Sequence, residues 1–421
     1  MSGGDTPAGV TDEGPARGPA AGTPAGARGG RAGRITGRLP DGLTDAVWLW
    51  LLLRVGLTMI AAFVVVWGQA SPPCASDAPL AWLPHDGPAF PLLGAWHHWD
   101  ACWYTTIASS GYGVGDGMGS TNLFPFLPLV ASALAGVNGN LPIAFAAVNG
   151  VALVVALMGL TRLVTRDVDR ATAQRTSLYV VVFPAAFFLI GPFTEAIFLA
   201  AAAWTFVGAR ERRWELAVIG GVVAGLTRPV GILLMLPVAW EAAMMVWDRR
   251  RAGSPLLRRG DVLAALAVIG PGLAYAGYVA WTAVVVGQSY FDAHLAWGEH
   301  HLAPPWEQLA AGIAYGLDHA KPAQLVNAGV WILFAALTLA GFRRLPLSYT
   351  LFVIPQLVLA VTQETVWPLM STSRYMLALF PCFVVLAIAG RSPRFHTTWV
   401  VLSTLLLGFL TILFIEGWMV G

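Results

Sequence analysis

Long apolar runs separated by short polar stretches dominate the pattern of hydrophobic and polar positions along the chain. The first run extends from about Val47 to Trp67. Further runs follow near residues 123–163, 177–209, 214–247, 261–287, 323–342, 347–362, 374–390 and 397–416. About 20 apolar residues are enough for a helix to cross a bilayer, and several runs are long enough for two spans. The pattern predicts an all-α, polytopic integral membrane bundle with about ten to twelve transmembrane helices.

Composition agrees with a membrane protein. Hydrophobic residues make up 57% of the chain, charged residues only 11%, and the mean hydropathy is +0.65. These values lie outside the range of soluble globular proteins. The net charge of +2 is too small to indicate a nucleic-acid partner. Abundant Ala, Gly, Pro and Arg indicate a GC-rich bacterial genome, and we therefore expect a bacterial plasma-membrane protein.

The first 42 residues contain almost no large apolar side chains. Such a segment cannot bury enough surface to fold, so residues 1–42 are predicted to form a disordered tail ahead of a membrane domain at 43–421. Arginines of this tail lead directly into the first apolar run, which predicts a cytoplasmic N-terminus. The start of the chain has no apolar region and cleavage site typical of a signal peptide, so the first run is expected to remain a membrane helix.

The arrangement of polar stretches predicts which loops face outward. Residues 68–122, rich in Pro, Gly, Trp and His, are expected to form a large first external loop with amphipathic interfacial helices. The arginine clusters at 209–214, 249–259, 342–344 and 391–394 are expected to be cytoplasmic. By alternation, 288–322 forms the second external loop, and 363–373 also faces outside.

The run at 123–163 has two interpretations. Two spans would place the arginine-containing segment 161–175 outside, against the positive-inside rule. One span preceded by a re-entrant piece, "FPFLPL" (124–129), would keep that segment inside. We favour the second interpretation.

An acidic residue interrupts the aromatic stretch "HHWDACWYTTIASSGYG" (97–113). At about 100° per residue, one helical face would carry Trp96, Trp99, Trp103, Tyr104 and Ile107. This face predicts a short amphipathic helix at the outer membrane surface. Asp100 lies among these aromatic residues, where a carboxylate costs free energy unless a partner or a site uses it. It is either a capped or salt-bridged structural residue or a catalytic or substrate-binding one, and we favour the second.

Three cysteines, Cys74, Cys102 and Cys382, show no metal-ligand spacing. Cys74 and Cys102 can form a disulfide if their loop faces an oxidising compartment.

Several segments together resemble a known family. "WDACWYTTIASSGY" followed by "NLFPFLPL" resembles the first lumenal loop of the GPI mannosyltransferase II (PIG-V) family, within the GT-C superfamily of polytopic glycosyltransferases. "GPFTEAIF" (191–198) resembles the Thr-Glu segment of that family, and "GGVVAGLTRPVGILL" (220–234) its Thr-Arg-Pro segment. "STSRYMLALFPCFVVLA" (371–387) resembles the Arg-Tyr and Phe-Pro helix of bacterial members. The resemblance covers about 95–390 in the right order.

The resemblance implies an inverting glycosyltransferase, most simply an α-mannosyltransferase, with a GT-C-type fold. The donor would be polyprenyl-phosphate mannose and the acceptor a glycolipid, lipoglycan or protein, on the outer membrane face, with membrane lipids but no nucleic acid as further partners. An acceptor hydroxyl must lose a proton as it attacks the anomeric carbon, and Asp100 is the candidate general base.

Arginine is suited to the departing lipid phosphate because its fork binds phosphate through two hydrogen bonds and stays charged. Arg228 and Arg374 are the candidates, since each lies within or at the rim of an apolar run. The alternative for each is an arginine that extends to the interface from a helix end. Trp99, Tyr104, Glu195 and Tyr375 complete the predicted substrate-binding set.

Two further charged residues lie inside apolar runs. Glu195 either pairs with an arginine such as Arg228 or binds sugar hydroxyls, and we favour the pair. Arg54 either pairs internally or binds a lipid phosphate.

No cofactor is expected. The histidine pairs 97–98 and 300–301 lack ligand spacing and are interpreted as interfacial polar residues. A divalent ion held by Asp292, His294, Glu299 and His300 remains an alternative.

Two other classes of function are compatible with a polytopic protein. A transporter or flippase of lipid-linked sugars would favour repeated halves, and no second copy of the Trp-Asp or Thr-Arg-Pro segment is found. A non-catalytic subunit of a glycan-assembly complex would tolerate Asn at position 100.

Overall fold

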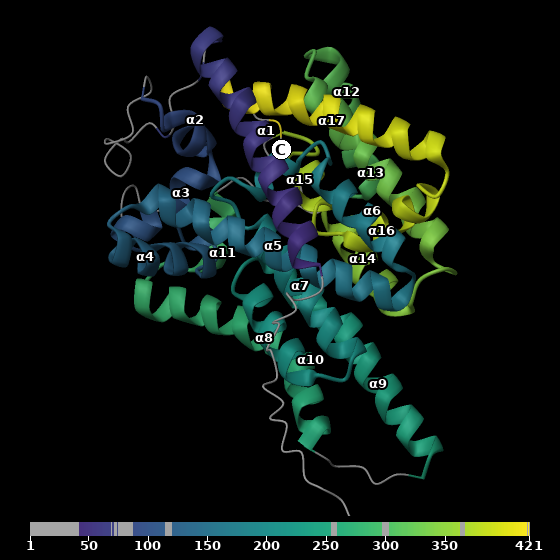
Figure 1. The fold of residues 1–421 in the computed structure, drawn as a ribbon. Helices are drawn as coiled ribbons and strands as arrows, with labels where there is room; N and C mark the ends of the chain where they lie inside the picture. The colour runs from purple at the N-terminus through teal and green to yellow at the C-terminus, as the bar shows by residue number, and fades with distance from the viewer. Residues whose placement is uncertain are drawn as a thin grey trace, which may run out of the picture. The chain divides into compact units, whose positions relative to one another are not determined.

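A computed structural model describes residues 42–68, 70, 74, 87–113, 120–253, 259–296, 303–362, 367–418 and 420. The chain divides into two units, 1–39 and 40–421, and every described residue belongs to the second. Residues 1–41 of the predicted tail (1–42), Glu299 and the histidine pair 300–301 lie outside the described residues. Where the chain is described, its regular structure is entirely helical, which confirms the predicted all-α class (Figure 1).

Within the described residues, six helical segments are long and apolar enough to cross a membrane. They are α1 (Leu43–Trp67), α5 (Leu141–Asp167), η5 with α9 (Pro229–Leu234, Met235–Arg251), α10 (Arg259–Trp281) with its π-helical extension η6 (Thr282–Val286), α13 (Pro322–Gly341) and α17 (Pro393–Ile415). Four shorter apolar helices accompany them: α4 (Phe126–Asn138), α8 (Trp214–Gly225), α14 (Leu347–Leu359) and α16 (Phe380–Ala389). These helices establish the integral membrane architecture.

In the described part of the chain, six long and four short apolar helices stand where ten to twelve spans were predicted, because proline and glycine interrupt apolar runs. The run at 177–209 is interrupted between α6 (Arg170–Val181) and α7 (Glu195–Arg210), where Pro184, Gly191 and Pro192 end regular helix. The run at 123–163 contains one helix of spanning length, α5, preceded by the 13-residue α4. Because α4 continues nine residues beyond the predicted re-entrant piece at 124–129, that piece is longer than expected. The cytoplasmic position of 161–175 stays a prediction.

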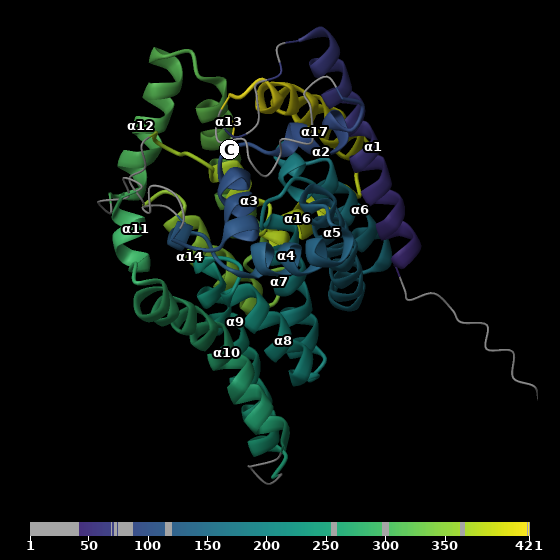
Figure 2. The same cartoon turned by 90° about the vertical axis from the view of Figure 1, so that its left-hand side faces the viewer.

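The centre of the bundle is α7, which is buried along nearly its whole length and packs against α5 and α8. A helix that is apolar on all sides has this position in a bundle. On the far side of α8 lies α10, and their close approach depends on Gly225, because a Cβ there would collide with the Pro271 carbonyl oxygen. Two views of the bundle show α7 enclosed by other helices (Figures 1 and 2).

The predicted amphipathic helix is shorter than expected. Its aromatic segment folds as α2 (Phe90–Leu93), η2 (Gly94–Trp96), a turn at 97–99 and α3 (Asp100–Ser110). Trp99 has a φ of +51°, so the chain changes direction immediately before Asp100. The expectation of one stripe from Trp96 to Ile107 is therefore wrong, because Trp96 and Trp99 precede the helix.

Hydrogen bonds to nearby carbonyls hold the turn that precedes α3. The indole of Trp96 donates to Pro91 O at 3.1 Å, and His97 Nδ1 lies 2.9 Å from Leu93 O. His97 and His98 are 1% and 6% exposed, so the prediction that this pair is interfacial is wrong. Burial lowers the pKa of His97 to about 4, so its ring is neutral near pH 7 and Nδ1–H donates to the carbonyl.

A disulfide joins Cys74 to Cys102, with the Cα atoms 5.4 Å apart. This confirms the pairing considered from the sequence. Because Cys102 lies in the first turn of α3, the bond attaches this helix to the preceding part of the loop.

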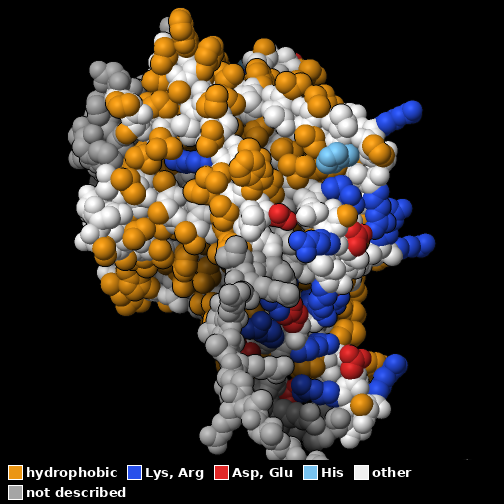
Figure 3. All heavy atoms as spheres, in the orientation of Figure 1, with side chains coloured by type: hydrophobic (Ala, Val, Ile, Leu, Met, Phe, Trp, Pro, Cys, Tyr) orange, Lys and Arg blue, Asp and Glu red, His pale blue; other side chains and the backbone are white. Residues whose placement is uncertain are grey.

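The remaining described helices are α11 (Tyr290–Ala296), α12 (Pro305–Asp318) and α15 (Thr372–Met376), with the short 3₁₀ segments η3 (Ser120–Asn122) and η4 (Ala186–Leu189). On the face drawn in Figure 3, hydrophobic side chains cover most of the upper part, whereas Lys and Arg gather toward the lower right. Such a separation is typical of a protein that lies in a bilayer with a charged interfacial end.

Candidate functional site

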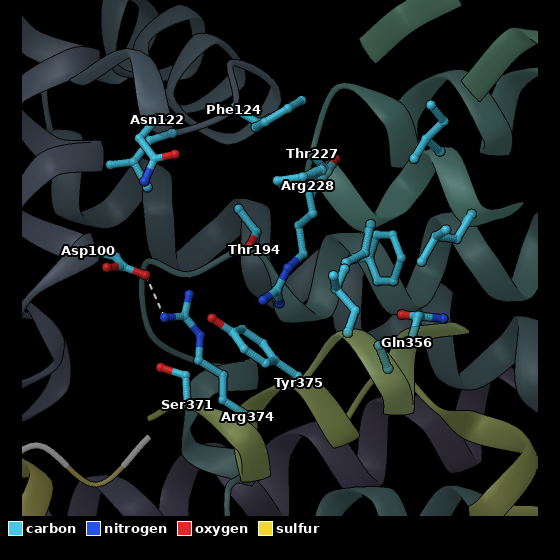
Figure 4. A pocket seen from close by; sticks show the side chains of 18 of the residues that line it. Asp100, Asn122, Phe124, Thr194, Thr227, Arg228, Gln356, Ser371, Arg374 and Tyr375 are labelled. Atoms are coloured by element: carbon cyan, nitrogen blue, oxygen red, sulfur yellow. Dashed lines mark hydrogen bonds and ion pairs between the residues drawn. The ribbon is translucent and has the colours of Figure 1, made fainter. Parts of the chain in front are cut away.

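A cavity of about 470 Å³ lies among α3, α7, η5, α11, α14 and α15. Segments from both halves of the sequence contribute its wall (Figure 4). The charged residues of the wall are Asp100, Arg228 and Arg374, and Tyr104 and Tyr375 also line it. The structure therefore gathers five of the seven predicted site residues around one cavity.

Four charged side chains form a continuous chain of alternating sign beside this cavity. Asp100 Oδ2 accepts a hydrogen bond from Arg374 Nη1 at 2.5 Å. Arg374 Nε donates to Glu195 Oε1, and the same oxygen accepts from Arg228 Nη1 at 2.6 Å. Two carboxylates and two guanidinium groups balance one another, which a poorly solvated site requires.

Glu195 is the buried centre of the chain of charges. Its side chain is 0% exposed and belongs to the first turn of α7. Oε1 accepts from both arginines, whereas Oε2 has no hydrogen-bond partner among the described residues. The predicted pair with Arg228 is confirmed. Because no side-chain atom of Glu195 reaches the solvent or the cavity wall, its geometry fits the orientation of two arginines better than contact with a sugar.

Aromatic rings pack against the guanidinium groups of the two arginines. The guanidinium carbon of Arg374 lies 5.0 Å from the ring centroids of both Phe188 and Phe193, and that of Arg228 lies 5.2 Å from the Tyr375 ring. A guanidinium over an aromatic face is stabilised by the ring quadrupole. Ring contacts and Glu195 together fix both groups at the cavity wall, where remaining N–H groups can bind an anion.

The other predicted residues take different positions. Tyr104 lies one turn after Asp100 on α3, and burial raises the pKa of its phenol, so it is a neutral hydrogen-bond donor near pH 7. Trp99 is not among the lining residues. Its ring packs against Phe414 of α17, with the centroids 5.1 Å apart. Arg54 donates to the carbonyl oxygens of Ile190, at 3.0 Å, and Leu92, so it pairs internally with the backbone.

Sequence reasoning missed several polar residues of the wall: Asn122, Thr194, Thr227, His294, Gln356 and Ser371. Asn122 Oδ1 lies 3.0 Å from His294 Nδ1, which joins η3 to α11. From the sequence, His294 is a candidate only as a metal ligand. Within the described segments, no three His, Cys, Asp or Glu residues are arranged to hold a metal ion. Of these residues, Gln356 is the one that the sequence could have identified as a site candidate, because it is a lone amide inside the apolar run at 347–362.

The wall changes character from one end of the cavity to the other. In Figure 4, Asp100 and Asn122 lie on one side, Arg374 and Arg228 in the middle, and Gln356 on the opposite side. Beyond the arginines, the wall is aliphatic where η5 packs against α14, with Val230, Ile232, Leu233, Leu359 and Ala360. The cavity therefore joins a hydrogen-bonding end and an apolar end through a cationic centre.

Comparison with solved structures finds matches at low sequence identity. ArnT from Cupriavidus metallidurans bound to undecaprenyl phosphate aligns over 83% of this chain and 62% of its own, with 14% identity and a TM-score of 0.48. The oligosaccharyltransferase of Archaeoglobus fulgidus aligns with zinc and sulfate (14% identity, 90% of this chain and 53% of its own, TM-score 0.43) and in the apo form (12%, 90% and 56%, TM-score 0.45). The chain thus spans less than two thirds of the length of each. No protein-family model and no curated protein matches the sequence.

Proposed function

We propose that the protein is an inverting glycosyltransferase that moves a sugar from a polyprenyl-phosphate carrier to an acceptor hydroxyl. The observation that carries the proposal is the single cavity in which Asp100 adjoins two buried arginines and an aliphatic end. A lipid-linked sugar has the matching order of parts: sugar, phosphate and hydrocarbon chain.

The arginines supply the cationic centre that a phosphate leaving group needs. Negative charge grows on the phosphate oxygens as the sugar departs, so fixed cations contribute most in the transition state. Arg228 and Arg374 are 11% and 9% exposed, and their aromatic and carboxylate partners hold them in place before substrate binds. Little reorganisation is then required during the reaction.

Asp100 is the proposed general base. Its Oδ2 is held by Arg374, while Oδ1 has no partner among the described residues and the side chain is 22% exposed. An acceptor hydroxyl bound at Oδ1 would lose its proton as its oxygen forms the bond to the anomeric carbon. The sugar–phosphate bond breaks on the opposite face with its electron pair, which gives inversion.

The ends of the cavity suggest how the two substrates are oriented. The hydrocarbon chain of the carrier would leave between η5 and α14, where Leu233 and Leu359 are among the lining residues. The acceptor would approach from the opposite end, where Asp100 and Asn122 lie (Figure 4) and where Asn122 and its partner His294 offer hydrogen-bonding groups to hydroxyls. In this proposal the acceptor and the hydrocarbon chain of the carrier occupy opposite ends of the cavity.

The outer face of a bacterial plasma membrane is the proposed location of the reaction. Disulfides persist in oxidising compartments, and the bond between Cys74 and Cys102 lies in the same loop as Asp100. Mannose is the proposed sugar, on the resemblance of the Trp-Asp, Thr-Glu, Thr-Arg-Pro and Arg-Tyr segments to the PIG-V family. The acceptor is a glycolipid, lipoglycan or protein.

The test is sugar transfer by membranes that contain wild type or Asp100→Asn at equal expression, supplied with radiolabelled polyprenyl-phosphate mannose. Wild type should label a lipid or protein fraction, and Asp100→Asn should lose about 100-fold or more of this activity, as expected for a general base. The matched control is Asp292→Asn, because Asp292 is an exposed carboxylate of α11 that does not line the cavity. Equal labelling by wild type and Asp100→Asn would refute the role of Asp100. No labelling by wild type would refute the donor.

A further inference from the structure

A second hollow lies between α9 and α10 and shares no lining residue with the cavity of the candidate site. Its volume is about 430 Å³. Small side chains from both helices form much of its wall: Ala242 and Ala243 on α9, Ala264 and Ala265 on α10. Because alanines leave the space between two helices open, the hollow is an apolar groove wide enough for a slender ligand.

Charged and aromatic residues form one end of this groove. Trp247 and Arg250 lie four and seven positions after Ala243, on the same face of α9. Asp261 of α10 also lines the groove, but its carboxylate is paired with Arg249. Arg251 lies with its guanidinium carbon 4.9 Å from the Trp247 ring centroid.

Arg250 differs from its two neighbours. It is exposed, and it has no ion-pair or hydrogen-bond partner within the described part of the chain. Since Asp261 is neutralised by Arg249, the groove end keeps an excess of positive charge. A ligand at this end should therefore carry a negative group next to an apolar portion.

The position of the groove indicates where such a ligand comes from. Both helices belong to segments long and apolar enough to cross a membrane, and the arginines stand at the end where the two helices are joined in sequence. Trp and Arg at the end of a span mark the depth of lipid headgroups. Lys and Arg gather in this lower region of the face in Figure 3, where Figure 1 draws α9. The groove then extends from headgroup depth toward the bilayer interior, about 12 Å from Arg250 to Ala242 along α9.

We propose that this groove binds one anionic phospholipid, with its phosphate on Arg250 and an acyl chain along the alanines of α9 and α10. Charge selects the lipid class, because phosphatidylglycerol carries a net negative charge, whereas the choline group of phosphatidylcholine would bring a cation to a cationic end. This site is independent of the proposed glycosyltransferase activity and needs no sugar donor for its test.

The experiment compares lipid binding by the purified full-length protein in detergent. Native mass spectrometry counts the lipids retained after addition of phosphatidylglycerol or phosphatidylcholine with identical acyl chains. Wild type should retain one phosphatidylglycerol in preference to phosphatidylcholine, and Arg250→Gln should weaken its binding about fivefold, the effect of one interfacial arginine. Arg394→Gln, an exposed arginine at the start of α17 and outside the groove, should bind as wild type does.

A second variant tests the apolar part separately. Ala265→Phe places a ring in the groove from an exposed position and should displace the acyl chain while it leaves Arg250 intact. Equal retention of both lipids by wild type would overturn the proposal. So would Arg250→Gln and Ala265→Phe proteins that both bind phosphatidylglycerol as tightly as wild type does. The proposal is also overturned if inorganic phosphate alone raises the melting temperature as much as phosphatidylglycerol, since the acyl chain would then contribute nothing.

Discussion

Asp100 and Arg374 are 274 positions apart in the sequence, yet Asp100 Oδ2 accepts a hydrogen bond from Arg374 Nη1 at 2.5 Å. The same guanidinium uses Nε to reach Glu195. Arg374 therefore connects the proposed base on α3 with the buried carboxylate at the start of α7. An arginine divided between two carboxylates has a fixed plane, and this plane decides which N–H groups face the cavity.

Arg374→Lys should lower kcat by about 100-fold, the cost of losing one oriented donor in the transition state. A lysine ammonium keeps the charge but cannot bind two carboxylates through separate, coplanar nitrogens. Transfer of radiolabelled mannose by membranes at equal expression measures the effect. Arg394→Lys, outside the cavity wall, is the control. The assignment fails if Arg374→Lys retains more than half of the wild-type rate.

Glu195→Gln should destabilise the folded protein by about 3 kcal/mol, because it leaves two buried guanidinium groups with one compensating carboxylate. Thermal unfolding in detergent measures the loss. The control is Glu215→Gln, at an exposed residue in the first turn of α8. Polyprenyl phosphate should stabilise Glu195→Gln more than wild type, since an anion at the arginines replaces the missing charge. Equal stabilisation of both proteins by this ligand would contradict the phosphate site at Arg228 and Arg374.

The pair of Glu195 with Arg228 was predictable from the sequence because each is an isolated charge inside an apolar run, where an unpaired charge is costly. The contact of Asp100 with Arg374 was not, since it depends on how α3 and α15 pack, and the sequence predicts a separate contact with substrate for each residue. Hydrogen bonds such as that between Asn122 and His294 join segments whose polar composition gives no periodic signal. The apolar runs predicted the membrane architecture. The proline-containing breaks in these runs were not predicted, and they make several helices shorter than the expected spans.

Leu233→Trp should raise the KM for a donor with a long polyprenyl chain by about tenfold, since a bulky ring at the aliphatic end excludes part of the hydrocarbon. A donor analogue with a short chain should be affected much less, and kcat should change little. The measurement is the chain-length dependence of KM for both proteins. Leu236→Trp, an exposed position of α9 outside the cavity wall, is the control. Equal effects on long and short donors would place the chain elsewhere.

Stability at acidic pH should depend on Asp169. Its carboxylate caps α6 by accepting from Thr172 N at 2.7 Å, and this hydrogen bond, with Arg391, lowers its pKa from 3.8 to about 2. Because the folded pKa is the lower one, the stabilisation is present above about pH 4 and is lost as the pH falls toward 2. Asp169→Ala should cost about 1 kcal/mol at pH 7, the usual value of an N-cap. Thermal unfolding as a function of pH checks this, and a difference from wild type as large at pH 2 as at pH 7 would contradict it.

The disulfide should matter for catalysis as well as for stability, because Cys102 lies only two residues after Asp100 on α3. Closing the loop from Cys74 to Cys102 is expected to contribute about 3 to 4 kcal/mol against the unfolded chain. Cys74→Ser should therefore lower the melting temperature and also reduce kcat, since the first turn of α3 and its carboxylate lose an attachment. Reductant should produce the same changes in wild type and none in Cys74→Ser. Cys382→Ser, at a buried thiol with no disulfide, serves as the control for loss of a sulfur atom, and it should respond to reductant as wild type does. A Cys74→Ser protein with lower stability but an unchanged kcat would show that the bond does not position Asp100.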